Sequence, residues 1–258
     1  MDSLNFKITT EALLDTFVEA GKLAKKISLQ GVKITIKADQ SPVTDGDIAV
    51  DKLLKKKITE LTPKIPIISE ETVNLLKENK NKTFWLIDPI DGTKDYIKKR
   101  DEYTLNAALI HNLKPVIGIV HAPAKERLFF SYGKDSSFEI SNGNKKKLNC
   151  KKVNINQIIG LANSDETPNE VLDIYNKNKV SKTIKMSSSL KFCVIAAGEA
   201  DIYAAKARAF EWDIAAGHAV LEHAGGSVTT HSGENFLYGK KNFKNLPIIA
   251  KRAENLKK

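Results

Sequence analysis

Two carboxylates at the end of an apolar run, Asp88 and Asp91, are the residues of this sequence best suited to chemistry. Residues 84–87 are all apolar and predict a buried strand, which Pro89 and Gly92 end where the charge begins. Such a turn can direct two acid side chains and a backbone carbonyl to one point. Hard divalent cations such as Mg²⁺ prefer these oxygen ligands, usually beside substrate phosphate. The alternative is that the two acids only form the turn, as Asp, Pro and Gly often do.

A second apolar run also ends on carboxylates, because Glu70 and Glu71 directly follow the strand-like residues 65–69. If the two strands are neighbours in one sheet, Glu70 and Asp88 can converge on one ion. An exposed acidic loop is the alternative for this segment.

Two further acids, Asp213 and Asp47, stand at predicted helix starts. Asp213 precedes the small residues 215–217, which would let its helix approach a phosphate and metal ions closely. A plain N-cap is the alternative for Asp213. Thr44 and Asp47 have the spacing of a capping box, which the local pattern favours. A carboxylate at this place could also orient a threonine hydroxyl.

Several other chemistries are not supported by the sequence. The histidines show no zinc-type spacing and no serine or cysteine nucleophile signature beside them. Neither the Walker-type phosphate loop nor the GxGxxG dinucleotide loop occurs. Cys150 and Cys193 have no CxxC spacing, so we assign neither thiol a chemical role. The chemistry that the sequence still supports is a reaction of a phosphate with water at bound Mg²⁺.

The first part of the chain must position most of these acids. Residues 10–29 carry a helical apolar stripe that ends near Gly31, and residues 32–36 alternate as a half-buried strand would. A second helix is expected after Pro42, with Ile48, Leu53, Leu54, Ile58 and Leu61 on its buried side. Strand-like runs follow at 65–69, 83–88, 103–111, 115–121, 127–132 and 137–140. Two helices and then a strand meander predict helices laid on one antiparallel sheet.

After residue 140 strands and helices alternate, which predicts an α/β lobe. Strands are expected at 158–163, 180–186, 201–205, 227–230 and 247–251, and helices at 168–176, 188–198 and 212–224. The turn at 142–144 is a plausible boundary between lobes 1–143 and 144–258. The 258 residues, 41% of them hydrophobic, suit two tightly packed lobes.

The net charge of +10 invites a nucleic-acid interpretation, which we reject because the positive charge is mostly lysine on solvated faces. A basic field would still attract a small polyanion. The first residues lack the features of a secretory signal, and no run approaches the roughly 18 apolar residues of a membrane span. A soluble, cytoplasmic protein is expected, with peripheral contact with the cytoplasmic face of the inner membrane left open.

Together these segments resemble the lithium-sensitive, Mg²⁺-dependent phosphomonoesterase superfamily, which includes inositol monophosphatase and fructose-1,6-bisphosphatase. The likeness rests on the Asp-Pro-Ile-Asp-Gly-Thr pattern at 88–93, Glu-Glu at 70–71 and Trp-Asp at 212–213. The stretches 37–44, 91–98, 188–193 and 212–220 are most similar to its bacterial 3′(2′),5′-bisphosphate nucleotidase branch. The resemblance implies an inositol-monophosphatase-like αβαβα sandwich, with an antiparallel-sheet lobe and a mixed-sheet α/β lobe.

The resemblance also implies an activity and a site. A monomer or homodimer would hydrolyse adenosine 3′,5′-bisphosphate, a by-product of sulfate assimilation, to AMP and phosphate with two or three Mg²⁺ ions per site. Metal ligands would be Glu70, Asp88, the Ile90 carbonyl, Asp91 and Asp213. Thr93, oriented by Asp47, would position the attacking water. Substrate contacts would come from Glu70, Asp91, Gly92, Thr93, Ser189, Lys191, Arg208 and Asp213.

Two departures from the family pattern concern specificity. Ser187 stands where the family usually has Gly, and residues 204–210 lack the usual Gly-Pro around Arg208. An inositol monophosphatase or related sugar phosphatase with the same metal motifs is the near alternative. A noncatalytic nucleotide or nucleic-acid binding protein is the distant one.

Overall fold

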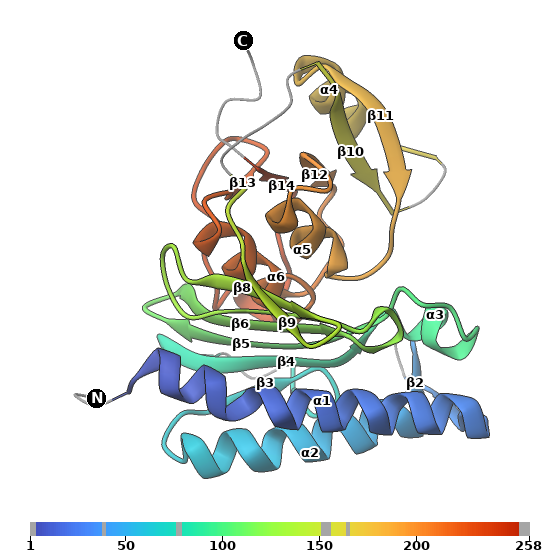
Figure 1. Ribbon diagram of the computed structural model, residues 1–258, viewed down its shortest axis with the longest axis vertical. Helices are drawn as coiled ribbons and strands as arrows, with labels where there is room; N and C mark the ends of the chain where they lie inside the picture. Colours follow the sequence, from blue (N-terminus) through green and yellow to red (C-terminus); the bar gives the residue numbers. More distant parts are fainter. Residues whose placement is uncertain (1–3, 38–39, 76–78, 151–155, 164–165, 253–258) are drawn as a thin grey trace.

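The computed structural model describes residues 4–37, 40–75, 79–150, 156–163 and 166–252. Figure 1 shows five layers: helices α1 and α2, a seven-stranded sheet, helices α5 and α6, a five-stranded sheet, and helix α4. The expected αβαβα sandwich is therefore confirmed. Within the described residues, no helix is long and apolar enough to cross a membrane.

The outer helical layer forms because both of its helices carry one apolar face. Helix α1 (Phe6–Gln30) begins at Asn5, whose side chain accepts the Ile8 amide, and ends at Gly31 with a φ of 94°. Helix α2 (Asp45–Leu61) pairs with it. Both cover one face of the large sheet with fully buried residues: Leu13, Phe17, Ala20, Ala24, Val50, Leu54 and Ile58.

The seven-stranded sheet positions the first acids. Its order in space follows the chain: β3 (Ile67–Ser69), β4 (Thr83–Asp91), β5 (Thr104–His111), β6 (Lys114–Ala122), β7 (Arg127–Ser131), β8 (Ser137–Ser141) and β9 (Asn144–Lys147). Every neighbouring pair is antiparallel except β3 and β4, which run parallel. The carboxyl ends of β3 and β4 therefore meet at one edge of the sheet.

The second sheet is mixed, as expected. Its order is β11 (Val180–Lys185), β10 (Ile158–Ala162), β12 (Ile202–Ala205), β14 (Ile248–Lys251) and β13 (Ser227–Thr230). Helix α4 (Asn169–Lys177) covers its outer face, while α5 (Leu190–Ala197) and α6 (Glu211–His223) lie between the sheets. Because β9 pairs with β8, the first sheet continues to Lys147, past the expected boundary at 143. The division into two lobes stays an interpretation.

Helix α6 lies directly on the large sheet because small residues face each other there. A Cβ on Gly118 of β6 would lie 2.3 Å from the Ala216 carbonyl oxygen, and one on Gly217 would lie 2.7 Å from Phe192 Cβ. The small residues after Asp213 thus bring α6 close to β6 and α5. One buried cluster includes Phe84 and Leu86 of the large sheet together with residues of α5 and α6, so both halves share a core.

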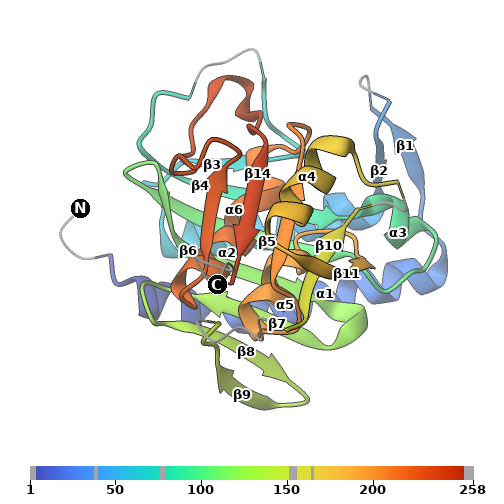
Figure 2. The ribbon, with the colours of Figure 1, turned by 90° about the horizontal axis from the view of Figure 1, so that it is seen from above.

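Two predictions about burial are wrong. Strand β1 (Ile34–Ile36) pairs with β2 (Pro42–Thr44) in a two-stranded hairpin that lies apart from the main sheets (Figure 2). Ile34 and Ile36 are accordingly 49% and 57% exposed instead of half-buried. Ile48, expected on the buried side of its helix, is 58% exposed, whereas its neighbours Asp47 and Val50 are buried, so Ile48 lies on the outer face of α2. Residues 38 and 39 of the family-like stretch 37–44 lie outside the described residues.

Candidate metal and phosphate site

The parallel pairing of β3 and β4 brings the first two acids together. Ser69 is the partner of Ile87, and the Glu70 amide donates to the Ile87 carbonyl at 3.1 Å, so Glu70 and Asp88 follow side by side. Asp213 reaches the same place from the first turn of α6. One carboxylate oxygen from each of these three residues lies within 4.8 Å of the other two. Three acids from distant stretches of chain therefore converge, as expected.

Asp88 and Asp213 have no ion-pair partner among the residues that the structure describes, whereas Glu70 pairs with Lys37 at 3.0 Å. Asp88 is 1% exposed, and its Oδ1 has no hydrogen-bond partner there. Burial, with Glu70, Asp91 and Asp213 nearby, raises the pKa of Asp88 well above its ordinary value. Burial and the charges of Asp91 and Glu70 do the same to the pKa of Asp213. Buried carboxylates without a counter-charge are unfavourable, and a divalent cation with oxygen preference fits this set.

Asp91 lies beside the three clustered acids rather than among them. It follows an irregularity in the pairing of β4 with β5 and stands opposite Thr104. Its Oδ2 accepts the Ser189 amide at 2.5 Å. Burial raises the pKa of Asp91 to about 6, although Lys191 and this hydrogen bond act in the other direction. Its role as a metal ligand stays a prediction.

Gly92 and Thr93 form the start of α3 (Thr93–Ile97). Gly92 has a φ of 91°, and a Cβ there would lie 3.3 Å from the Glu102 carbonyl oxygen, so glycine suits this turn. Amides at a helix start have no carbonyl partner within the helix and can bind an anion. The Thr93 hydroxyl donates to the Ile90 carbonyl at 3.1 Å.

Asp47 is a capping residue, as its spacing predicted. Its Oδ2 accepts the Thr44 amide at 2.8 Å and the Thr44 hydroxyl at 2.5 Å, and its own amide donates to that hydroxyl. Burial raises the pKa of Asp47 to about 6. Within the described part of the chain no hydrogen bond joins Asp47 to Thr93, so the orienting role stays a prediction.

The acids open onto a cavity of about 570 Å³ that also carries positive charge. Lys191 and Arg208 line it, as do Lys94 and Lys206. The Lys191 ammonium donates to the Ser188 carbonyl at 2.5 Å, and burial lowers its pKa to about 8. The cavity combines acids that could hold cations with bases that could bind phosphate, which suits a phosphorylated ligand.

Ser189 does not lie on the wall of this cavity, although Ser187 and Ser188 do. Ser189 is 1% exposed, and its hydroxyl lies 2.7 Å from Asn106 Oδ1 and 2.9 Å from Thr104 Oγ1. The predicted contact between Ser189 and the substrate therefore gains no support from its position.

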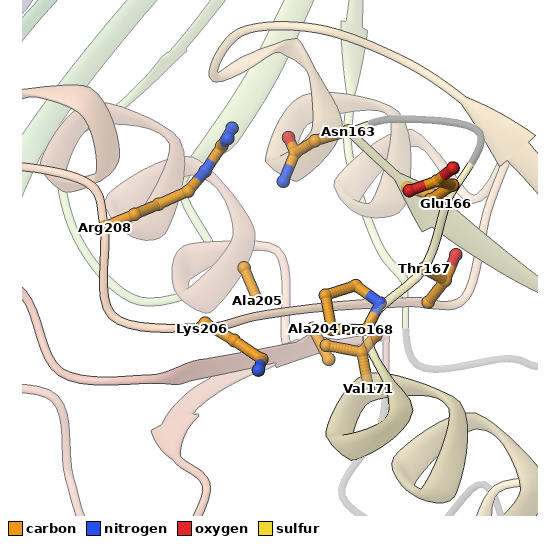
Figure 3. Close-up of a pocket in the computed structure, with 10 residues that line it drawn as sticks. Asn163, Glu166, Thr167, Pro168, Val171, Ala204, Ala205, Lys206 and Arg208 are labelled. Atoms are coloured by element: carbon orange, nitrogen blue, oxygen red, sulfur yellow. The ribbon is translucent and has the colours of Figure 1, made fainter.

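A smaller pocket of about 150 Å³ adjoins the main cavity. Arg208, Lys206, Asn163 and Ala205 line both of them. Figure 3 shows Pro168 and Val171 at the start of α4, across the small pocket from Arg208. The site thus extends beyond Arg208, away from the acids.

Sequence reasoning missed two residues beside the acids. The Lys37 ammonium lies 3.0 Å from Glu70 Oε1 and 2.9 Å from Glu71 Oε1. Its place in the family-like stretch 37–44 was the available signal. Asn106 is the cross-strand partner of Asp88. An amide side chain within the apolar run 105–110 was a signal that the side chain has a task there.

The chain belongs to the inositol monophosphatase family, whose sequence profile matches residues 8–256. Enzymes of this family use divalent metal ions. The 3′(2′),5′-bisphosphate nucleotidase CysQ of Buchnera aphidicola subsp. Acyrthosiphon pisum is 40% identical over 209 residues, which cover 80% of this chain and 78% of that protein. The protein of the same name from Haemophilus influenzae is 30% identical over 245 residues, with 93% and 91% coverage.

Solved structures give the same picture. CysQ from Bacteroides thetaiotaomicron, described as a bacterial member of the inositol monophosphatase family, has a TM-score of 0.79 and 28% identity, covering 96% of this chain and 98% of that one. A staphylococcal IMPase-I complexed with products also has a TM-score of 0.79, at 18% identity and with 96% and 92% coverage. The second likeness shows the shared fold alone.

Proposed function

We propose that this protein is a Mg²⁺-dependent phosphomonoesterase that hydrolyses adenosine 3′,5′-bisphosphate to AMP and phosphate. The observation that carries the proposal is the convergence of Glu70, Asp88 and Asp213 at the edge of a cavity with basic residues, around a buried Asp88 oxygen that has no hydrogen-bond partner in the described part of the chain. Family membership and the names of the most similar relatives support it.

The proposed metal ligands fall into two overlapping sets that share Asp88. One Mg²⁺ ion would be held by Glu70, Asp88 and the Ile90 carbonyl. A second would be held by Asp88, Asp91 and Asp213, and the site would take two or three ions in total. When bound, the ions activate water and neutralise the charge that develops on the leaving oxygen. Glu70 must exchange its ion pair with Lys37 for this role.

The chain's own residues bind and orient the phosphates. The amides of Gly92 and Thr93, at the start of α3, would receive the phosphate that is cleaved. The Thr93 hydroxyl, now on the Ile90 carbonyl, would turn toward Asp47 and hold the attacking water in place. Lys191 and Arg208 would attract the second phosphate. Because the two amides and the two basic side chains already line one site in the folded chain, they would contribute orientation and electrostatic stabilisation once the Thr93 hydroxyl has turned.

The extent of the site favours a nucleotide over a smaller ligand. Beyond Arg208 the small pocket provides additional room, bordered by apolar side chains of α4, toward which a nucleoside could extend. Ser187 lines the main cavity, and residues of the segment 204–210 line both the main cavity and the small pocket. These positions, which differ from the family pattern, are the ones that would adjust specificity. An inositol or sugar phosphatase remains the alternative that the shared metal motifs allow.

A substrate panel tests the proposal. Phosphate release from adenosine 3′,5′-bisphosphate and from inositol 1-phosphate should be compared with Mg²⁺, with a chelator, and with added Li⁺. The proposal expects Mg²⁺-dependent, Li⁺-inhibited release with a kcat/KM at least about 100-fold higher for the nucleotide, a difference of about 2.7 kcal/mol. Preference for inositol 1-phosphate would favour the alternative, and release unaffected by the chelator would contradict the metal centre.

A further inference from the structure

Ser189 lies directly behind the wall of the cavity, next to residues that form it. Ser188 has a φ of 54°, a left-handed turn of the chain. Ser187, Ser188 and Lys191 line the cavity, whereas Ser189 faces the interior and is almost completely buried. The Ser189 hydroxyl is within hydrogen-bond distance of Asn106 Oδ1 and Thr104 Oγ1 on β5. The polar groups of Ser189 are thus directed to the large sheet.

Both polar groups of Ser189 lead to proposed metal ligands. The Ser189 amide donates directly to Asp91 Oδ2. Its hydroxyl donates to Asn106, the cross-strand partner of Asp88. Directly opposed residues of antiparallel strands project from the same face of the sheet, so the Asn106 and Asp88 side chains are neighbours. Ser189 therefore links helix α5 to the turn that carries both aspartates.

The hydrogen-bond network that begins at Ser189 leaves two buried polar atoms near Asp88 without a partner in the described residues. Asn106 Nδ2 and Asp88 Oδ1 are both buried, and neither has a hydrogen-bond partner in the described residues. Thr104, Asn106 and Ser189 are each at most 1% exposed. Buried hydrogen-bond networks fix side-chain geometry when satisfied, and unsatisfied groups are unfavourable. This network would hold its geometry best once a cation occupies the free side of Asp88.

We propose that Ser189 is a positioning residue that sets the affinity of the site for divalent cations. Its amide holds Asp91, and its hydroxyl holds Asn106 beside Asp88, so that the two carboxylates keep the separation that a cation needs. The inference rests on the proposed metal-dependent function. It replaces the direct contact with nucleotide that the sequence suggested for Ser189.

Cation binding without nucleotide tests the inference apart from catalysis. Free Mn²⁺ is counted by electron paramagnetic resonance while the purified protein is titrated with Mn²⁺ alone. We expect Ser189→Ala to weaken Mn²⁺ binding about tenfold, because it removes a hydroxyl that serves two buried hydrogen bonds. Thr104→Val keeps the side-chain shape, loses one of those bonds, and should weaken binding about threefold. Ser188→Ala, the adjacent serine on the cavity wall, is the matched control and should leave Mn²⁺ binding unchanged.

Kinetics supply a second readout that distinguishes positioning from contact. Ser189→Ala should need more Mg²⁺ for half-maximal activity, yet its KM for the nucleotide at saturating Mg²⁺ should stay within about twofold of wild type. In the double variant Ser189→Ala/Thr104→Val, the loss of Mn²⁺ affinity should be smaller than the product of the two single losses. Both substitutions remove the same hydrogen bond between Ser189 and Thr104, and this bond can be lost only once.

The outcomes separate the inference from the proposed function. Wild-type Mn²⁺ affinity in Ser189→Ala, with a raised KM for the nucleotide at every Mg²⁺ concentration, would overturn the positioning role. Absence of Mn²⁺ binding in the wild-type protein would overturn the proposed metal centre instead. If thermal unfolding shows that Ser189→Ala is misfolded, Thr104→Val decides, and unchanged Mn²⁺ binding in that variant also counts against the inference.

Discussion

The acidic and basic sides of the cavity are built from different kinds of structure. The acids Glu70 and Asp88 stand at the ends of paired strands, and Asp213 stands in the first turn of a buried helix. On the basic side, Lys191 belongs to the first turn of α5, and Arg208 lies between β12 and α6, outside regular structure. All three acids thus stand at the ends of regular elements, whereas one of the two bases, Arg208, lies in a connecting segment.

The serines before α5 show how the second side depends on the first. The Ser187 hydroxyl donates to Asp95 Oδ2 at 2.5 Å, and the Ser187 amide donates to Glu102 Oε2 at 2.8 Å. Ser189 is held by Asp91 in the same way. Carboxylates next to the acidic side of the cavity therefore hold the loop that precedes Lys191. We expect substitutions on the acidic side to reduce activity more than substitutions on the basic side.

The largest effect should follow from removing the shared acid. In Asp88→Asn, kcat/KM for adenosine 3′,5′-bisphosphate should fall about 1000-fold or more, about 4 kcal/mol, because both proposed cations lose a ligand. In the presence of a chelator the variant should be at least as stable as wild type, since a buried charge without a partner is gone. Phosphate release measures the predicted loss of activity, and thermal unfolding in chelator measures the predicted stability. A stable variant with near-normal activity would remove Asp88 from the site.

On the basic side, Lys191→Met should raise KM for the nucleotide about 30-fold while kcat changes little. The methionine keeps the apolar stem but removes the charge that, in our proposal, attracts the second phosphate. Steady-state kinetics measure KM for the nucleotide. p-Nitrophenyl phosphate has no second phosphate, so its KM should change less. Lys94→Met, another lysine of the same cavity, is the control and should change KM less than threefold. Equal increases of KM in the two variants would mean that the basic residues act through their summed charge and that Lys191 has no specific contact with a phosphate.

The pH dependence of stability should differ between the metal-free and metal-bound protein. Burial raises the pKa of Asp47 and Asp91 to about 6 and also raises the pKa values of Asp88 and Asp213, so the folded state binds protons more readily than the unfolded state. Between pH 8 and pH 6 these carboxyls should therefore contribute on the order of 1 kcal/mol more to the free energy of unfolding in chelator at the lower pH.

Saturating Mg²⁺ should remove this gain, because bound cations keep the carboxylates ionised. Urea unfolding at both pH values, with and without Mg²⁺, measures the difference. His121 and His223 act in the opposite direction in both states, because burial lowers the pKa of each to about 4 and the unfolded chain, with its ordinary histidine pKa of about 6.5, binds protons first. Their loss of stability as the pH falls through about 7 is common to the two states and cancels when they are compared. An identical pH response in both states would show that the cations bind elsewhere.

The smallest effect is expected at Ser187. Ser187→Ala should raise KM for the nucleotide about threefold and leave kcat unchanged, because the loop loses one hydrogen bond to Asp95 but keeps its amide bond to Glu102. The same kinetic assay measures it. Arg100→Ala, which removes the other partner of Asp95, should leave KM unchanged. A much larger effect at Ser187 would mean that the hydroxyl contacts the substrate.

The two sides also differ in how well the sequence predicts them. Glu70 and Asp88 could be predicted because each follows an apolar run, and the parallel pairing of β3 with β4 places both at one edge. The burial of Ser189 could not, because one left-handed residue, Ser188, directs the neighbouring side chains to opposite sides. Periodicity likewise predicted a half-buried strand at 32–36, since a pattern cannot show that the hairpin lies apart from the core.

The central claim is that carboxylates from distant stretches of chain hold divalent cations beside the cavity. Crystals soaked with Mn²⁺, measured near the manganese absorption edge, test it most directly. We expect anomalous density between Glu70, Asp88 and Asp213, with Asp88 oxygens at coordination distance, about 2.0–2.3 Å. Density confined to other acids, with this cluster empty at saturating Mn²⁺, would contradict it.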